Sequence, residues 1–420
     1  MGNGLYKATF LRPGPRMPGV LYEPLNKSDK SRVGIIAIHP EADYLDHTIG
    51  PNLSKRGYTV LCANTSDQTE SLAMKIKDVK HAYEFMKALP GIEKVIIMGH
   101  SGGATLMSAY QAIAENGVKV FQGPEKVYRC PDYLDGLEPA DGFISLDSNW
   151  GNGAMRLIGT DPSVMDESSG VKIDESLNLF NPANGFDPAG CMYDEAFLKR
   201  YFQAQHERNN RLIDFALERL AVIEAGKGLY ADDEPMIIPG ALCLRPNNKI
   251  FPQDLRFLCR TKDAHTLLHK DGVVTHEIVH TVRKATNFQS LTGSLCRGAV
   301  HTTVRKFLDS HAVRSLDEYH FDAAEIYGID WTSSYNCTPG NVQSVTVPMV
   351  AAGMTASWEF AAVEVIYNNA ASSDKTAVFV DGANHDFFTE KACERFEGEF
   401  GDTVDTLYNY LDEWISQRFV

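Results

Sequence analysis

The stretch VIIMGHSGGATLMSAYQAIAENG, residues 95–117, decides the fold, because an apolar run stops there at a serine between glycines and a helical pattern begins. Residues 94–98 are typical of a buried strand and residues 104–115 of a helix. Glycines on both sides of Ser101 indicate a turn so tight that a Cβ at either flank would clash, which exposes the serine hydroxyl. The strand–turn–helix context therefore predicts Ser101 as a nucleophile. The alternative is a turn in which glycine only provides slack.

Strands and helices alternate on both sides of this stretch. Residues 33–38 form a continuous apolar run of the kind found in parallel strands that are buried on both faces, and residues 58–63 and 140–147 are also expected to be strands. Residues 5–24 hold two strand-like runs joined by a Pro/Gly turn, as in an antiparallel hairpin. This order predicts an α/β fold with a mostly parallel sheet flanked by helices.

The alternation breaks in the middle of the chain and resumes near the C-terminus. We therefore expect one α/β core made of residues 1–147 and 346–420, with residues 148–345 inserted as a cap or lid. The cap is expected to be mainly helical, with a long helix over residues 194–225. It is also expected to contain a β-hairpin that turns at Asp271.

Bulk composition narrows the classes of function. The 420 residues are 44% apolar and 23% charged, which is ordinary for a soluble globular protein. A net charge of −15 argues against binding nucleic acid or an anionic membrane through general electrostatics, which leaves a small-molecule partner. The chain has no apolar stretch of signal-peptide or bilayer length, so a cytoplasmic location is expected. The eight cysteines include no CxxC pair that would suggest zinc or redox chemistry.

A second motif, His276-Glu277-Ile278-Val279-His280, matches HExxH, which on a helix places two imidazoles on one zinc ion. The flanking β-branched runs instead predict a strand, on which four residues span roughly 13 Å, against about 6 Å along a helix. His276 and His280 could not then share an ion. We therefore expect no metal here, and a zinc metallopeptidase is the least favoured alternative.

Several of these segments together resemble the α/β-hydrolase superfamily. They are the opening strand pair, GIIAIHP (34–40), VIIMGHSGG (95–103), FISLD (143–147) and VDGANHDF (380–387). The resemblance covers about residues 1–150 and 345–420. The middle of the chain matches only as a cap, in the place where this family commonly carries one. The resemblance implies the α/β-hydrolase fold and a catalytic triad, and it does not name a substrate.

A serine hydroxyl needs a base, because it is essentially never ionised near neutral pH. Of the 13 histidines, His385 follows the last expected strand in a loop that should return to the edge of the sheet where Ser101 lies. We therefore assign His385 as the base.

The acid departs from the pattern of the family. The usual aspartate would follow the strand that ends in Gly353, but Met354, Thr355 and Ala356 stand there. Some members carry the carboxylate after the strand that follows the nucleophile helix, where this chain has Asp147. Asp147 is therefore assigned as the acid that orients the imidazole. Two later carboxylates, Glu359 and Glu364, are the alternatives for this acid. Glu364 is expected to lie on a helix surface.

The resemblance also implies two backbone donors for an oxyanion. One is the N–H of Gly102, directly after the nucleophile. The other belongs to the loop after residue 39, where Pro40 has no N–H, so Glu41 or Ala42 must donate.

These assignments predict a serine hydrolase without a cofactor. It would cleave a carboxylic ester, lactone or related acyl bond of a small apolar or aromatic substrate through an acyl-enzyme on Ser101. An acyltransferase with the same triad and a non-catalytic binding protein on the same fold are the alternatives. Substrate identity, cleavage of amide or C–C bonds, and assembly into a homo-oligomer stay open.

Overall fold

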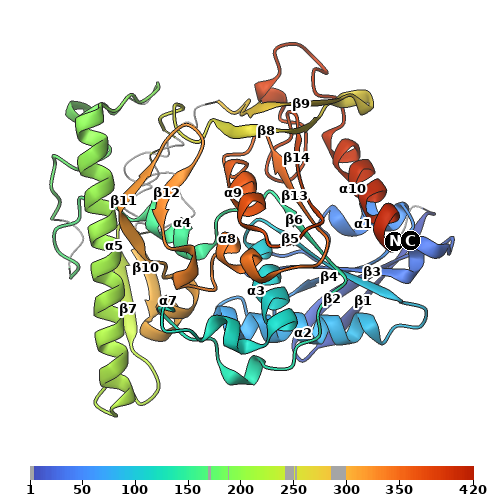
Figure 1. Cartoon of the computed structure of the whole chain (residues 1–420), viewed down its shortest axis with the longest axis horizontal. Coiled ribbons are helices and arrows are strands. Elements are labelled where there is room, and N and C mark those ends of the chain that lie inside the picture. Colours follow the sequence, from blue (N-terminus) through green and yellow to red (C-terminus); the bar gives the residue numbers. More distant parts are fainter. Residues whose placement is uncertain (1–3, 169–171, 188, 242–249, 251–252, 285–298) are drawn as a thin grey trace.

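The computed structural model describes residues 4–168, 172–187, 189–241, 250, 253–284 and 299–420. Its centre is a ten-stranded sheet with parallel strands through the middle and antiparallel strands at both edges (Figure 1). In spatial order the strands are β1 (Tyr6–Gly14), β2 (Met17–Pro24), β4 (Thr59–Asn64), β3 (Val33–His39), β5 (Lys94–His100), β6 (Gly142–Leu146), β13 (Met349–Met354), β14 (Lys375–Val380), β8 (Arg260–Leu268) and β9 (Val274–His280). The expected mostly parallel sheet is confirmed.

Apolar residues cover both faces of the sheet, as the continuous apolar runs predict. Along β3, Ile36 and Ile38 join one buried cluster, and Ile35 and Ala37 join another on the opposite face. The first cluster also takes residues from helices α2 (Leu72–Lys87), α3 (Gly102–Asn116) and α9 (Ala361–Asn369). The second takes residues from α1 (Ile49–Lys55) and α10 (Thr403–Phe419). The sheet is therefore sandwiched between two helical layers.

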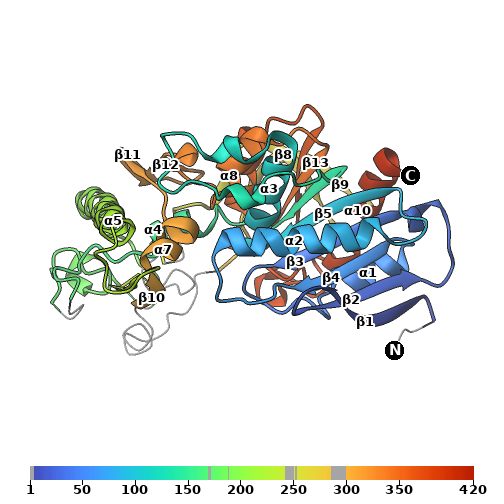
Figure 2. The same ribbon diagram turned by 90° about the horizontal axis from the view of Figure 1, so that it is seen from below.

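Between β6 and β13 the chain builds a region beside the sheet, which we call the inserted region (Figures 1 and 2). Its elements are α4 (Asn152–Gly159), α5 (Glu195–Glu224), β7 (Pro235–Pro239), β10 (Ala299–Thr303), α7 (Val304–His311), β11 (Ser315–Phe321), β12 (Ile326–Ile329) and α8 (Thr338–Asn341). The strands form two antiparallel pairs, β7 with β10 and β11 with β12. The long helix predicted over residues 194–225 is α5, and Asp194 caps it by accepting the N–H of Phe197 at 2.7 Å.

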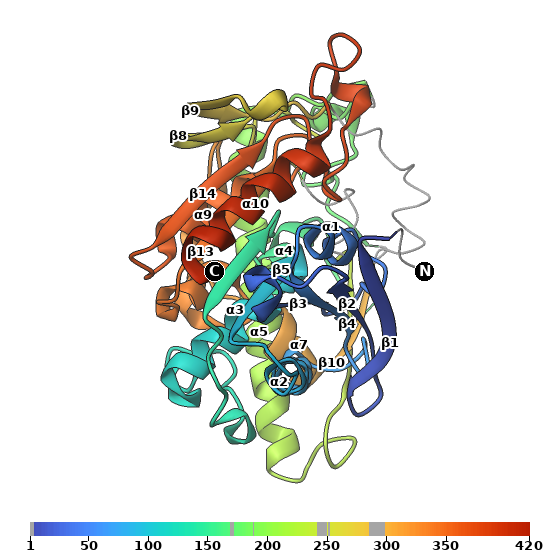
Figure 3. The same ribbon diagram turned by 90° about the vertical axis from the view of Figure 1, so that its right-hand side faces the viewer.

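The hairpin that was expected within the cap has a different place. Its strands β8 and β9 extend the main sheet, because residues 266–268 pair in parallel with residues 378–380 of β14 (Figure 3). Without β8, β14 would be an open edge with unpaired N–H and C=O groups. Residues 260–280 therefore belong to the sheet, and the expected boundary at 148–345 has to be corrected at this point.

The HExxH motif lies on β9, where His276 pairs with Thr266 and His280 with Arg260. The predicted strand conformation of this motif is confirmed. Within the described ranges, no helix combines the length and the apolar character that crossing a bilayer requires.

Candidate active site

Ser101 lies in a strained turn between the end of β5 and the start of α3. Its φ of 54° and ψ of −129° are rarely adopted by an L-residue and cost about 1–3 kcal/mol. A Cβ on Gly99 would lie 2.3 Å from the Cα of Ala104, and one on Gly103 would lie 2.8 Å from the carbonyl oxygen of Ile38. Those two glycines are therefore required by close backbone packing, as the sequence predicts.

His385 and Asp147 meet at the carboxyl edge of the sheet. Asp147 directly follows β6 and His385 lies in the loop after β14, and their Oδ2 and Nδ1 atoms are 2.7 Å apart. Asp147 is fully buried. Its other carboxylate oxygen accepts the N–H of Met354 at 2.9 Å, and its own N–H donates to the carbonyl oxygen of Ala352 at 2.7 Å. These two hydrogen bonds tie Asp147, at the end of β6, to the neighbouring strand β13 and hold its carboxylate in place beside the imidazole.

Glu359 brings a second buried carboxylate to the same place. The hydroxyl of Ser101 donates to Oε2 of Glu359 at 3.4 Å, and the same oxygen is 3.9 Å from Nδ1 of His385. The sequence offered Glu359 as an alternative to Asp147. In the structure both carboxylates lie near the imidazole of His385. Glu364 lies elsewhere. It is buried and not on the surface, because it accepts the N–H groups of Lys262 and Asp263 at the start of β8.

The surrounding charges decide the protonation of His385. Burial alone would lower the pKa of His385. Three carboxylates outweigh this effect: Glu359 through its charge, Asp147 through its hydrogen bond and charge, and Asp386 through its charge. The pKa of His385 is raised to about 9. The resting imidazole is therefore mainly protonated near neutral pH.

Aromatic and histidine rings support the loop that carries His385. The ring of His100, the residue before Ser101, lies 4.5 Å from the ring of His385 between their centroids. Its Nε2 donates to the backbone carbonyl of His385 at 2.8 Å, and its Nδ1 accepts the hydroxyl of Tyr44 at 2.5 Å. Burial holds the pKa of His100 well below its usual range, so the ring stays neutral. No sequence pattern predicted a role for His100 or Tyr44, although His100 directly precedes Ser101 in the sequence.

One group of side chains is close enough together to bind a cation, namely His47, His100 and Asp386. Both ring nitrogens of His100 are already in hydrogen bonds with protein groups. This donor set therefore does not provide an argument for a metal ion.

The loop after β3 is arranged differently from the expectation for an oxyanion hole. The N–H groups of Glu41 and Ala42 both donate to Nδ1 of His39, at 3.0 and 2.8 Å. They are therefore engaged inside the loop. Gly102 is the first residue of α3, and the first N–H of a helix has no acceptor within the helix. This position is compatible with the predicted role of Gly102 as an oxyanion donor, which stays a prediction.

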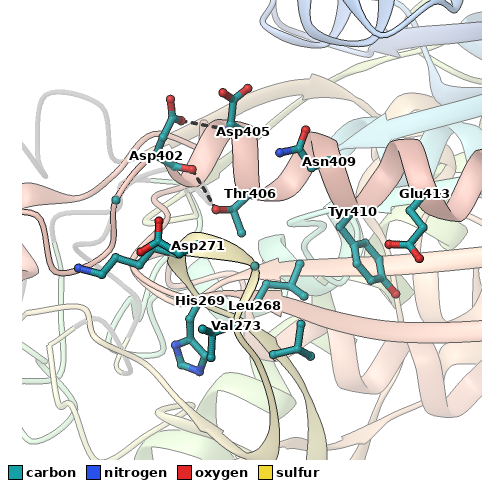
Figure 4. A pocket seen from close by; sticks show the side chains of 14 residues that line it. Leu268, His269, Asp271, Val273, Asp402, Asp405, Thr406, Asn409, Tyr410 and Glu413 are labelled. Carbon is teal, nitrogen blue, oxygen red and sulfur yellow. Dashed lines mark hydrogen bonds between the residues drawn. The ribbon is translucent and has the colours of Figure 1, made fainter.

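A separate pocket of about 460 Å³ lies between the turn of the β8–β9 hairpin and α10 (Figure 4). Acidic side chains surround it, among them Asp271, Asp402 and Asp405. None of Ser101, His385 and Asp147 lines it. It is therefore distinct from the candidate active site.

Comparison with known proteins gives distant structural similarity only. No protein-family model and no curated protein matches the chain. A siderophore hydrolase from Aspergillus fumigatus is 10% identical, with 100% of both chains covered and a TM-score of 0.43. A soluble variant of monoglyceride lipase from Saccharomyces cerevisiae is 12% identical, with 99% of this chain and 96% of that chain covered and a TM-score of 0.42. A dienelactone hydrolase from Anabaena variabilis is 9% identical, with coverages of 98% and 97% and a TM-score of 0.38.

The fold follows from the topology of this chain itself. A serine stands on a strained turn between a central parallel strand and a helix, and an acid and then a histidine follow later strands of the same sheet. That strand–turn–helix context and the chain order Ser, Asp, His are those of the α/β-hydrolases. The chain has the α/β-hydrolase fold.

Proposed function

We propose that the protein is a serine hydrolase that cleaves a carboxylic ester, lactone or related acyl bond through an acyl-enzyme on Ser101. One observation carries this proposal, namely the 2.7 Å pair of His385 and buried Asp147, which Glu359 and the ring of His100 link to the strained Ser101 turn. Strain of this kind persists only where the surrounding structure enforces it, and it is concentrated at functional sites.

In the proposed reaction, the hydroxyl of Ser101 leaves Glu359 and turns toward Nε2 of His385. The nitrogen takes the proton while Oγ attacks the carbonyl carbon, and the carbonyl oxygen becomes an oxyanion beside the N–H of Gly102. The imidazolium then protonates the leaving oxygen as the bond to it breaks. Water attacks the acyl-enzyme with the same histidine as its base, which releases the acid and restores Ser101.

The two carboxylates have different parts in this scheme. Asp147 accepts a hydrogen bond at Nδ1, which fixes the tautomer that leaves Nε2 free to act as a base. Glu359 adds negative charge that stabilises the imidazolium but also keeps His385 protonated at rest, because it contributes to the raised pKa of that ring. Only the deprotonated fraction of the enzyme can begin the reaction, so turnover should increase with pH.

The alternatives now have different support. A non-catalytic binding protein was favoured by the absence of the usual acid, and Asp147 supplies a carboxylate in contact with His385. An acyltransferase would use the same residues and differ only in the acceptor of the acyl group. A zinc peptidase has the least support, because HExxH lies on strand β9.

We also propose that the inserted region acts as a cap over the site. An aromatic substrate has little support from it, because Phe202, Phe257 and Phe321 pack against one another with ring centroids 4.6 to 6.2 Å apart. These rings stabilise the inserted region itself.

Labelling with a fluorophosphonate probe tests the proposal. We expect the wild-type protein to be modified at Ser101, located by peptide mass spectrometry, and a screen of esters, lactones and amides to give turnover. Ser101→Ala should lose labelling and roughly 10⁶-fold in kcat, as in other triad enzymes, with an unchanged melting temperature. An unlabelled wild-type protein, or turnover retained in Ser101→Ala, would contradict the proposal.

A further inference from the structure

The imidazole of His39 lies against the residue that follows the nucleophile. A Cβ built on Gly102 would be 3.4 Å from Nε2 of His39, and one on Gly103 would be 3.7 Å from the Cα of His39. The end of β3 and the start of α3 therefore touch at this point, and Nε2 is the ring atom directed at Gly102. The ring is half-buried and stacks on Tyr44, with 5.1 Å between the centroids.

Hydrogen bonds of the loop fix the tautomer of this ring. Nδ1 accepts two backbone N–H groups, from Glu41 and Ala42, so it cannot carry a proton. In the neutral imidazole the proton then resides on Nε2, which is a donor. Among the described residues, that N–H has no protein acceptor in hydrogen-bond contact.

The ring also stays neutral over the whole range in which an esterase would work. Burial and the positive charges of His385, Lys75 and His47 lower the pKa of His39 to about 3. Its Nε2–H is therefore a fixed neutral donor and does not exchange its proton with a substrate.

The same loop lacks the usual backbone donor. Pro40 has no N–H, and the next two N–H groups are directed at His39. We propose that His39 replaces them, so that its Nε2–H and the N–H of Gly102 together bind the oxyanion formed at Ser101. The inference rests on the proposed hydrolase function and gives the site its second oxyanion donor.

No covalent step is assigned to His39. The carbonyl oxygen of the substrate gains a negative charge as Oγ of Ser101 adds to the carbon, and Nε2–H donates a hydrogen bond to that oxygen while keeping its proton. Donors that are already oriented in this way stabilise the transition state without reorganisation. Removing one such donor costs about 10²–10³ in kcat.

Two substitutions separate this role from support of the loop. In His39→Asn the side-chain oxygen takes the place of Nδ1, so it can still accept the N–H groups of Glu41 and Ala42, but no donor reaches the position of Nε2. In His39→Gln the amide nitrogen takes the place of Nε2 as a donor, and the acceptor at Nδ1 is lost.

We expect His39→Asn to lose about 10²–10³ in kcat with little change in KM, and His39→Gln to recover most of that loss. The measurements are steady-state kinetics on the best substrate of the screen and the melting temperature of each variant. If His39 only supports the loop, the order reverses, with His39→Gln impaired and His39→Asn active. That result would overturn the inference, as would wild-type kcat in His39→Asn.

Failure of the underlying hydrolase proposal has its own signature. An inactive wild-type protein without labelling at Ser101 would remove both proposals together. An active, labelled wild-type protein with a fully active His39→Asn variant would remove only the role of His39.

Discussion

Among the described residues, two histidine–carboxylate pairs have nearly equal lengths and buried carboxylates, and we propose a catalytic role for only one of them. Nδ1 of His385 lies 2.7 Å from Oδ2 of Asp147. Nε2 of His265 lies 2.8 Å from Oε1 of Glu364. The side chain of His385 is 36% exposed, whereas that of His265 is 8% exposed. Exposure and neighbours, and not the pair itself, therefore distinguish the two.

The surroundings of the second pair indicate a structural role. The ring of His265 on β8 lies 5.7 Å from the ring of Phe379 on β14. Its partner Glu364 also accepts the backbone N–H groups of Lys262 and Asp263, at 2.6 and 2.8 Å, and so joins α9 to the start of β8. His385 instead lies in a loop at the strained turn of Ser101. A histidine–carboxylate pair can act as a base only where its second ring nitrogen can reach a nucleophile.

The largest difference between the pairs should appear in turnover. Asp147→Asn keeps an oxygen for the N–H of Met354 but favours the wrong tautomer of His385 and removes the charge that stabilises the imidazolium. We expect kcat to fall by about 10⁴, or about 5 kcal/mol of transition-state stabilisation. Steady-state kinetics measure this loss.

Glu364→Gln is the matched control and should keep kcat within about tenfold, since Glu364 lies outside the site. If Glu364→Gln loses as much activity as Asp147→Asn, the division into a catalytic and a structural pair is wrong. Normal turnover in Asp147→Asn would make Asp147 a structural residue.

The second pair should instead reveal itself in stability. Glu364→Gln leaves one oxygen to accept hydrogen bonds that two carboxylate oxygens shared, so we expect a loss of about 2–4 kcal/mol in the free energy of unfolding. Urea denaturation at pH 7 measures this loss.

The pH dependence gives a further check on the role of Glu364. Burial alone would raise its pKa, but the hydrogen bonds from His265 and from the N–H groups of Lys262 and Asp263 lower it. A carboxyl with a lowered pKa contributes stability above its unfolded pKa of about 4.3, and this contribution is lost as the pH falls through the folded value. The gap between the wild type and Glu364→Gln should thus narrow in acid. A gap that widens below pH 4 would contradict this assignment.

The contrast between the pairs also shows how far the sequence could predict this molecule. The Ser101 turn, the buried runs of the sheet and the long helix α5 follow from local pattern alone, and the structure confirms them. His385 could be assigned because it follows the last parallel strand. Glu364 was expected on a surface because its neighbour β8 is about 100 residues away in the sequence, and no local pattern predicts that pairing.

Two features of the site depend on the path of loops between elements. Glu359 was only an alternative to Asp147, yet the loop after β13 places its Oε2 3.9 Å from Nδ1 of His385, in addition to Asp147. The ring of His39 captures the N–H groups of Glu41 and Ala42, which a sequence motif assigns to the oxyanion. Such contacts depend on side-chain directions that the hydrophobic period does not encode.

The smallest expected effect concerns Glu359, the second carboxylate near His385, whereas His265 has an ion pair with Glu364 alone among the described residues. Among the groups that raise the pKa of His385 to about 9, the charge of Glu359 contributes most. At pH 7 a base with that pKa is neutral in only about one molecule in a hundred, so kcat/KM should rise with pH up to about 9. Glu359→Gln should move this rise to lower pH by about one unit. This is the low end of the pKa shifts that an opposite charge within about 4–6 Å causes, because Asp147 and Asp386 remain near the ring.

The direction of the change in activity distinguishes Glu359 from Asp147. If Glu359 only raises the pKa of His385, kcat/KM of Glu359→Gln at pH 7 should increase by roughly tenfold, whereas Asp147→Asn should lose activity. Asp386→Asn, which removes an exposed carboxylate that contributes least to the raised pKa, is the control and should move the profile less. A profile of kcat/KM against pH from 5 to 10 for the three proteins measures both changes. A loss near 10⁴ at every pH in Glu359→Gln would instead make Glu359 the acid of the triad, and an unmoved profile would mean that His385 does not respond to its charge.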